Sequence, residues 1–454
     1  MKQIVVLSVV ASTMIMAGGN IAPVEPAVEP AVEAAPAVEK ESTGKVSGQL
    51  RAFYIDRTYS GSLENNRNSL AVGGWLGYDS AELNGLSFGT KFYAVEGLRI
   101  HDKSEDVLGS ASYDPSLYGD GFADYGFIGE AYLTYKAGKT DIKVGRQKLN
   151  TPLAGADDAR MLPNLFEAAV LHNNDIENTT LALAHITKQT VGTFGNVYGA
   201  PSALSLQSGY GLGYKEGTNG KFADVGVIAL GKGNDTAGVT AAAVIYKGIE
   251  GVKLQAWNYY AHDILNAVYL QADLGWNCLI SDSIKMKGSV QYINQSDIGD
   301  ALAGEVDSNY IAGKIGTSIG NLSGYVAYSQ TDSSDGAMNG GIITPWGGMP
   351  AFTQGMVTRH MFFADTATTK VAATYNMKEM TGLNLKATGY YTSFDIGSEN
   401  TYKPGTEWTA KEAGFDIKYQ ATKALNLRFR GNFPTDFAPG LDWSEYRLIA
   451  NYTF

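Results

Sequence analysis

Two aspartates and one arginine stand close together in a short segment that is bounded by prolines. Asp157, Asp158 and Arg160 lie between Pro152 and Pro163, and the two prolines restrict the backbone of this segment. Charges of both signs on a constrained loop can create a transverse electric field that orients and filters charged solutes in an aqueous passage. The same carboxylates can instead form salt bridges or turn hydrogen bonds that fix the loop to a wall. Both interpretations stay open, and neither involves covalent chemistry.

A second set of charges consists of basic residues that alternate with apolar residues in extended segments. These residues are Arg51, Lys386, Arg428, Arg430 and Arg447. If they line one wall, they form a basic track that draws anions or the carboxylate end of a zwitterion. The alternative is that acidic residues from loops pair with these cations and cancel their effect.

Metal-dependent and nucleophilic chemistry find little support in the sequence. The histidines at positions 172, 185, 262 and 360 show no ligand spacing, and no nucleophile elbow is present. A net charge of -11 argues against a basic surface for nucleic acid. We therefore expect a protein that is not an enzyme, needs no cofactor and has no nucleic-acid partner.

The elements that must position these charges are β-strands. From Gly44 to Phe454, segments of about 9 to 13 residues alternate apolar and polar side chains with period two. Short turns alternate with long connections near 98–123, 149–165, 189–239 and 331–367. We count eighteen strands, and residues 222–230 are either a further strand or part of a loop.

This layout predicts an all-β fold, a transmembrane antiparallel β-barrel of about 18 strands. An open sheet edge in lipid would leave unpaired backbone groups that cost several kcal/mol each, so the sheet must close. Closure makes the first and last strands neighbours, and Arg51, Arg428, Arg430 and Arg447 then converge on one stretch of wall. A lumen of this size is too wide to be filled by strand side chains and should be narrowed by loops.

The N-terminus predicts export of the protein. Lys2 precedes an apolar run to Met16 that ends in small residues, which is typical of a signal peptide, here residues 1–17. Residues 18–43 repeat Pro, Ala, Val and Glu and predict an extended periplasmic arm. Residues 44–454 form the predicted barrel. No later segment looks like a stop-transfer helix, so we expect the bacterial outer membrane as the location.

The C-terminus carries aromatic and apolar residues at alternate positions and ends on Phe454. Tyr446, Tyr452 and Phe454 share one face of the last predicted strand. This pattern resembles the signal that the outer-membrane assembly machinery reads, so we expect that machinery as a partner.

Several stretches resemble the OprD family of porins, and the epsilonproteobacterial branch is the most similar. They are FYIDR at 53–57, GWLGY at 74–78, GEAYL at 129–133, VGRQ at 144–147 and LNTPLAGADDARMLPN at 149–164. The resemblance implies a barrel whose third loop folds into the lumen, which here corresponds to Asn150 through Asn164. It also implies that Asp157, Asp158 and Arg160 belong to the pore constriction. A monomer and a homotrimer both remain open.

The resemblance implies passive diffusion of small hydrophilic solutes or ions, including carboxylates, amino acids or peptides. The expected surroundings are outer-membrane lipid and lipopolysaccharide. A different class of function also fits: a structural or adhesive surface protein with a plugged barrel, whose loops 189–239 and 331–367 bind a host or a neighbouring cell.

Arg146 breaks the predicted pattern, because it has the same parity as Ile142 and Val144, which should face lipid. Either Gly145 introduces a β-bulge or Arg146 lies near a membrane interface. We favour the bulge, with Arg146 anchoring the 150–164 loop.

Overall fold

The structure is a computed structural model. It describes the residues 44–100, 112–281, 283–333 and 339–454. The predicted signal peptide and the predicted arm lie outside these described residues.

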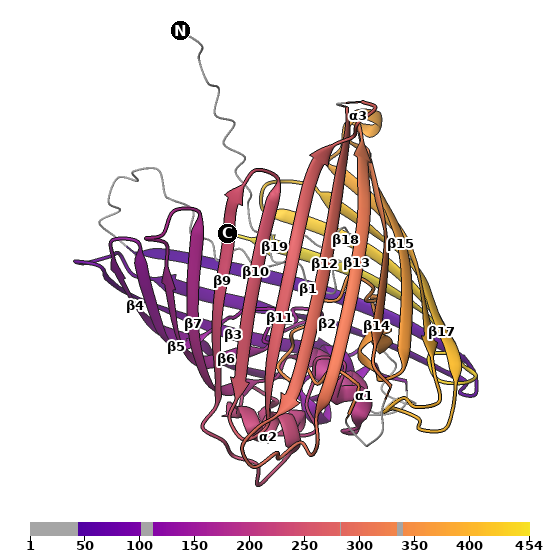
Figure 1. The fold of residues 1–454 in the computed structure, drawn as a ribbon, viewed down its shortest axis with the longest axis horizontal. Coiled ribbons are helices and arrows are strands. Elements are labelled where there is room, and N and C mark those ends of the chain that lie inside the picture. The colour runs from indigo at the N-terminus through magenta and orange to yellow at the C-terminus, as the bar shows by residue number, and fades with distance from the viewer. Residues whose placement is uncertain (1–43, 101–111, 282, 334–338) are drawn as a thin grey trace.

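One antiparallel sheet makes up the wall of the molecule (Figure 1). Its strands are β1 (Lys45–Gly61), β2 (Asn65–Asp79), β3 (Leu86–Leu98), β4 (Tyr125–Ala137), β5 (Thr140–Gln147), β6 (Leu165–Asn173), β7 (Thr179–Thr190), β8 (Ala223–Asp224), β9 (Val239–Ile249), β10 (Val252–Ala261), β11 (Leu265–Asn277), β12 (Ile284–Asp297), β13 (Asp307–Ile319), β14 (Leu322–Thr331), β15 (Thr366–Asn376), β16 (Leu385–Ile396), β17 (Trp408–Gln420), β18 (Leu425–Thr435) and β19 (Leu441–Thr453). Among the described residues the sheet has nineteen strands. The two-residue β8 is an addition to the eighteen that close the barrel, because β7 pairs directly with β9.

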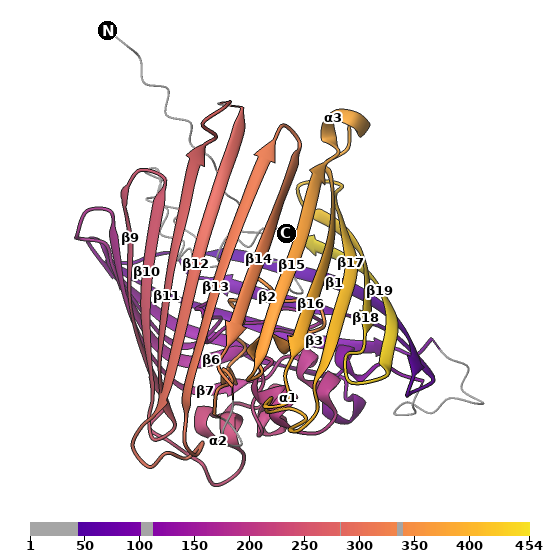
Figure 2. The same ribbon diagram turned by 45° about the vertical axis from the view of Figure 1, so that its right-hand side comes forward.

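The helices are short and belong to the connections. They are α1 (Ala203–Leu206), α2 (Val225–Leu230), α3 (Lys378–Thr381) and the 3-10 helices Pro115–Leu117, Asp120–Phe122, Thr193–Tyr198, Tyr214–Gly217 and His360–Phe362. Within residues 222–230, which the sequence left open between strand and loop, Ala223–Asp224 form the short strand β8 and Val225–Leu230 form α2. Among the described residues, no helix is long and apolar enough to cross a membrane. Figures 1 and 2 show α1 and α2 at the end of the barrel opposite α3.

The alternation in the sequence becomes an inner and an outer face of the wall. In β16, Thr388, Tyr390 and Thr392 are buried, whereas Tyr391 between them is exposed. Large apolar side chains such as Leu76 and Ile311 are more than half exposed on the outer face. The prediction of an eighteen-stranded antiparallel barrel is confirmed, and period two is the physical reason, because successive side chains of a strand point to opposite faces.

The first and last strands of the wall close the barrel. β1 pairs with β19 along thirteen residues, from Gln49 opposite Thr453 to Gly61 opposite Leu441. The main chains of Gly48 and Phe454 exchange two further hydrogen bonds of 2.9 and 3.1 Å. The side chains of Tyr446, Tyr452 and Phe454 are each at least 40% exposed on the outer face. Their role as an assembly signal stays a prediction.

The predicted bulge at Gly145 is wrong. The pairing of β5 with β4 runs without a break from Arg146, which lies opposite Ala131. The pairing of β5 with β6 is also unbroken. Gly145 takes a positive φ of 125° without adding a residue. Arg146 therefore stays on the same face as Val144 and pairs with Glu167 of β6 at 3.0 Å instead of holding the 150–164 loop.

We predict that Gly74→Ala weakens the barrel. Gly74 has a φ of 136°, and a Cβ there would overlap the carbonyl oxygen of Gln49 on the paired strand. A strained backbone position costs about 1–3 kcal/mol, so the urea midpoint of unfolding should fall, as followed by the heat-modifiable gel shift. Gly389→Ala is the control, because nothing lies within 4 Å of its added Cβ. Equal midpoints for the two variants would contradict the prediction.

Candidate functional site

Three connections fold into the barrel from the end that carries α1 and α2. We call them loop A (150–164), loop B (191–238) and loop C (339–363, the described part of its connection). Loop A and most of loop C are buried. Main-chain hydrogen bonds join the loops directly, from Gly155 to the carbonyl of Trp346 at 2.9 Å and from Gly347 to the carbonyl of Gly209 at 2.9 Å. The three loops therefore form one packed body inside the wall.

The two consecutive aspartates of loop A point in opposite directions. Asp157 accepts two hydrogen bonds from the Arg359 guanidinium of loop C, at 2.8 and 3.1 Å, and one from the Tyr210 hydroxyl of loop B at 3.2 Å. Asp158 faces the wall, where it pairs with Arg51 of β1 at 2.7 Å and with Lys148 at 3.1 Å. Both carboxylates thus fix the loop, as one of the two sequence-based interpretations expects.

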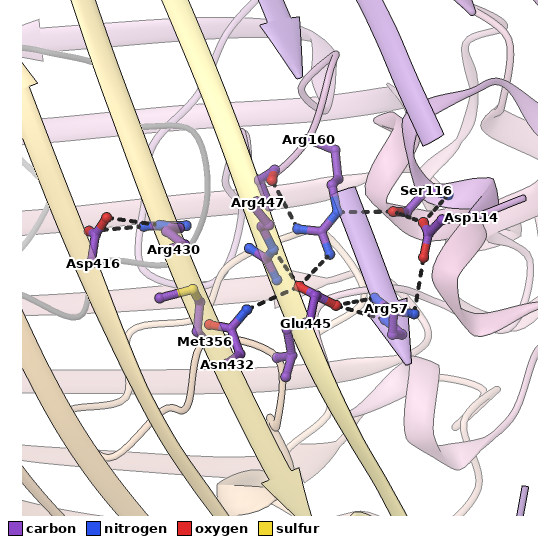
Figure 3. A network of polar contacts seen from close by, with 12 residues as sticks. Arg57, Asp114, Ser116, Arg160, Met356, Asp416, Arg430, Asn432, Glu445 and Arg447 are labelled. Atoms are coloured by element: carbon purple, nitrogen blue, oxygen red, sulfur yellow. Dashed lines mark hydrogen bonds and ion pairs between the residues drawn. The ribbon is translucent and has the colours of Figure 1, made fainter. Parts of the chain in front are cut away.

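Arg160 reaches from loop A into a cluster of buried charges on β1 and β19 (Figure 3). Its Nε donates to Ser116 Oγ at 3.0 Å, and its Nη2 lies 3.9 Å from Glu445. Glu445 also pairs with Arg57 and with Arg447. One carboxylate of the wall is therefore shared by three guanidinium groups, all of them less than 4% exposed.

The predicted basic track continues across the next strands of the inner face. Arg428 and Arg430 both pair with Asp416 of β17, and Arg430 lies directly opposite Arg447 of β19 in the register. Lys386 stands at the exposed end of this wall, opposite Lys418. The structure thus brings Arg51, Arg428, Arg430 and Arg447 together and leaves Lys386 at the rim.

The pKa values of two loop A residues reflect this environment. Burial would raise the pKa of Asp158, but Arg51 and Lys148 outweigh it and hold that pKa at about 2. Burial, together with the nearby Arg447, lowers the pKa of Arg160 to about 9, although Glu445 acts in the opposite direction. Burial is thus the main cause of the lowered pKa of Arg160, and Glu445 offsets it only in part.

Sequence reasoning missed several members of this site. Arg57 has the parity of Arg51 on β1, and Glu445 has the parity of Arg447 on β19, so the alternation rule contained both. Asp416 lies on the inner face of β17 and could have been found in the same way. Arg359 and Asp114 lie in loops, where alternation gives no signal; Asp114 pairs with Arg57 at 3.2 Å.

Loop C is inside the barrel instead of standing above it. Trp346 Nε1 donates to the carbonyl of Val225 at 3.0 Å, and Phe352 and Phe362 are no more than 2% exposed. This placement does not favour residues 339–363 as an exposed adhesive epitope. No group of three or more His, Cys, Asp or Glu side chains in the described part of the chain could hold a metal ion.

A closed barrel with charged loops folded against a basic inner wall defines an outer-membrane β-barrel channel. Residues 42–454 match the sequence profile of the outer membrane porins of the OprD family, and the chain belongs to that family. Members of this family are channels of the outer membrane and not enzymes. They pass small solutes.

Solved structures of low sequence identity share the fold. Pseudomonas aeruginosa OpdK, determined with vanillate, is 16% identical at a TM-score of 0.70, over 90% of this chain and 98% of that one. P. aeruginosa OccK9 (OpdG) is 18% identical at a TM-score of 0.71, with the same coverage of both chains. Acinetobacter baumannii OccAB2 is 19% identical at a TM-score of 0.69, over 90% of this chain and 98% of that one. Among curated protein sequences, none matches this chain.

We predict that Asp158→Asn releases loop A from the wall and changes the single-channel conductance at pH 7. Because the folded-state pKa of Asp158 lies below its ordinary value of 3.8, the ion pair stabilises the loop fully above that value and is lost as the pH falls toward 2. The wild type should therefore conduct alike at pH 7 and pH 5. Asp300→Asn, at an exposed turn, is the control. Wild-type conductance in the Asp158→Asn variant at pH 7 would contradict this role.

Proposed function

We propose that this porin favours small anionic solutes, carboxylates in particular, and that its basic track selects them. Six arginines of the inner wall and loop A form ion pairs with only four carboxylates. The arginines are Arg51, Arg57, Arg160, Arg428, Arg430 and Arg447, and the carboxylates are Asp114, Asp158, Asp416 and Glu445. The excess of cations on a buried wall produces a positive potential that attracts anions. This imbalance is the observation that carries the proposal.

Two guanidinium nitrogens that lack a hydrogen-bond acceptor mark where we expect an anion to bind. Nη2 of Arg160 and Nη2 of Arg447 are buried and have no hydrogen-bond acceptor among the described residues. A buried donor without an acceptor costs about 1–3 kcal/mol, and a carboxylate oxygen between the two groups would remove that cost. Charge-assisted hydrogen bonds from arginine to carboxylate are among the stronger polar contacts.

The constriction charges fit the same proposal. Asp158 neutralises Arg51, and Asp157 neutralises Arg359, which leaves the Arg160, Arg430 and Arg447 region as the more basic part of the wall. The structure of OpdK determined with vanillate, an aromatic carboxylate, is consistent with this solute class. Solute size and the exact carboxylate are set by the loops that narrow the lumen.

We predict an anion preference that depends on Arg160. In a planar bilayer with a salt gradient, the wild type should give a reversal potential on the anion-selective side, and Arg160→Gln should shift it toward the cation side because one buried positive charge is removed. Benzoate should reduce the ion current more than benzamide, its neutral analogue. Arg99→Gln, whose guanidinium is half exposed, is the matched control. A cation-selective wild type would refute the proposal.

A further inference from the structure

The wall of the barrel touches loop C at a row of three inner-face residues. Lys370 of β15 lies opposite Thr392 of β16, and Thr392 lies opposite Glu412 of β17. All three are at most 2% exposed. They belong to adjacent strands, so their side chains stand side by side at one level of the wall.

Two of these residues donate hydrogen bonds to main-chain carbonyls of loop C. Thr392 Oγ1 donates to the carbonyl of Thr353 at 3.1 Å, and Lys370 Nζ donates to the carbonyl of Gln354. The side chain of Thr353 is held as well, because its hydroxyl lies 2.6 Å from that of Ser329. The wall therefore offers donors where the loop presents acceptors.

The third residue accepts from main-chain amides of the same loop. Glu412 receives N–H donors from Met356 at 2.7 Å, Val357 at 3.2 Å and Thr358 at 2.6 Å. The hydroxyl of Tyr390 also donates to it. Four donors converge on two carboxylate oxygens, which suits an ionised carboxylate because it only accepts. The fit is specific to a glutamate, since an amide would bring its own donors.

The residues that follow these three amides make the contacts of the constriction. Arg359 forms the two-pronged ion pair with Asp157 of loop A, and its guanidinium lies 4.3 Å from the ring centre of Phe194 in loop B. His360 Nε2 is 2.7 Å from the carbonyl of Phe437, in the turn between β18 and β19. Any shift of residues 356–358 on the wall would thus move Arg359 relative to Asp157.

We propose that Lys370, Thr392 and Glu412 form a main-chain clamp that holds loop C in the lumen, with Glu412 as the positioning residue for Arg359 in the constriction. The clamp goes beyond the anion preference and does not depend on it, because it sets the width and steadiness of the passage and not the sign of the favoured ion. Loss of the clamp lets loop C leave its place while the barrel wall stays intact.

The test is the single-channel current of Glu412→Gln in symmetric salt. Removing a charge-assisted hydrogen bond lowers the stability of the held state by an amount that corresponds to roughly a tenfold population change. We expect a higher-conductance level that is occupied roughly tenfold more often than in the wild type, with an unchanged unfolding midpoint of the barrel. Glu407→Gln, an exposed glutamate in the neighbouring connection, should conduct as the wild type does.

A second variant perturbs the contact between Glu412 and loop C by a substitution in the loop. The Cβ of Gly355→Ala would lie 2.8 Å from Glu412 Oε2 and 2.7 Å from the Thr358 carbonyl oxygen, so it should displace the carboxylate and give the same higher level. Gly389→Ala, with open space around its Cβ, is the matched control. If Glu412→Gln does not fold, Gly355→Ala and Tyr390→Phe decide the question.

Wild-type current levels in folded Glu412→Gln and in Gly355→Ala would overturn the clamp. The same holds if the unfolding midpoint falls while the current levels stay unchanged, because Glu412 would then be structural only. These outcomes are independent of the reversal potential, so failure of the anion preference and failure of the clamp can be told apart.

Discussion

The pairing of β1 with β19 is the constraint on which the rest of the structure depends. A sheet in lipid has to satisfy every main-chain N–H and carbonyl group internally, and closure is the way a sheet can do so. The closing register places Ile55 opposite Arg447 and Arg57 opposite Glu445. Closure therefore brings Arg51 and Arg57 of β1 next to the charged residues of β19, although these residues come from the two ends of the chain.

The buried charges show how such a wall is kept stable. Desolvation of an arginine or a carboxylate is expensive, and only close partners with good geometry offset it. Glu445 and Asp416 act as shared partners on the wall, and loop A supplies Asp158 to Arg51. Loop A thereby contributes to the stability of the wall as well as to the narrowing of the lumen. The residues to which we assign the anion preference are thus also residues that stabilise the wall.

The sequence predicts the wall well and the interior only in part. Alternation with period two and the lengths of the turns suffice for the eighteen strands, and parity places Arg428, Arg430 and Arg447 on the inner face. The rule also holds at Arg146, which stays on the face of Val144, and what was wrong was the bulge expected at Gly145, a glycine that takes a positive φ without adding a residue. The partners Arg359 and Tyr210 of Asp157 lie in irregular loops, and their contacts depend on three-dimensional packing that no local pattern encodes. Residues 225–230 have the composition of a strand, but they form a helix because Asp224 caps its first turn and β7 already pairs with β9.

The way in which loop C is held has an evolutionary consequence. Lys370, Thr392 and Glu412 contact main-chain carbonyl and amide groups. Every residue has these groups, except that proline lacks the N–H. Substitutions of side chains such as Gln354 or Val357 leave those contacts in place, so selection can change the lining of the passage without losing the anchorage of the loop. A barrel built in this way can acquire new solute preferences by point mutation within one loop while its scaffold stays under separate selection.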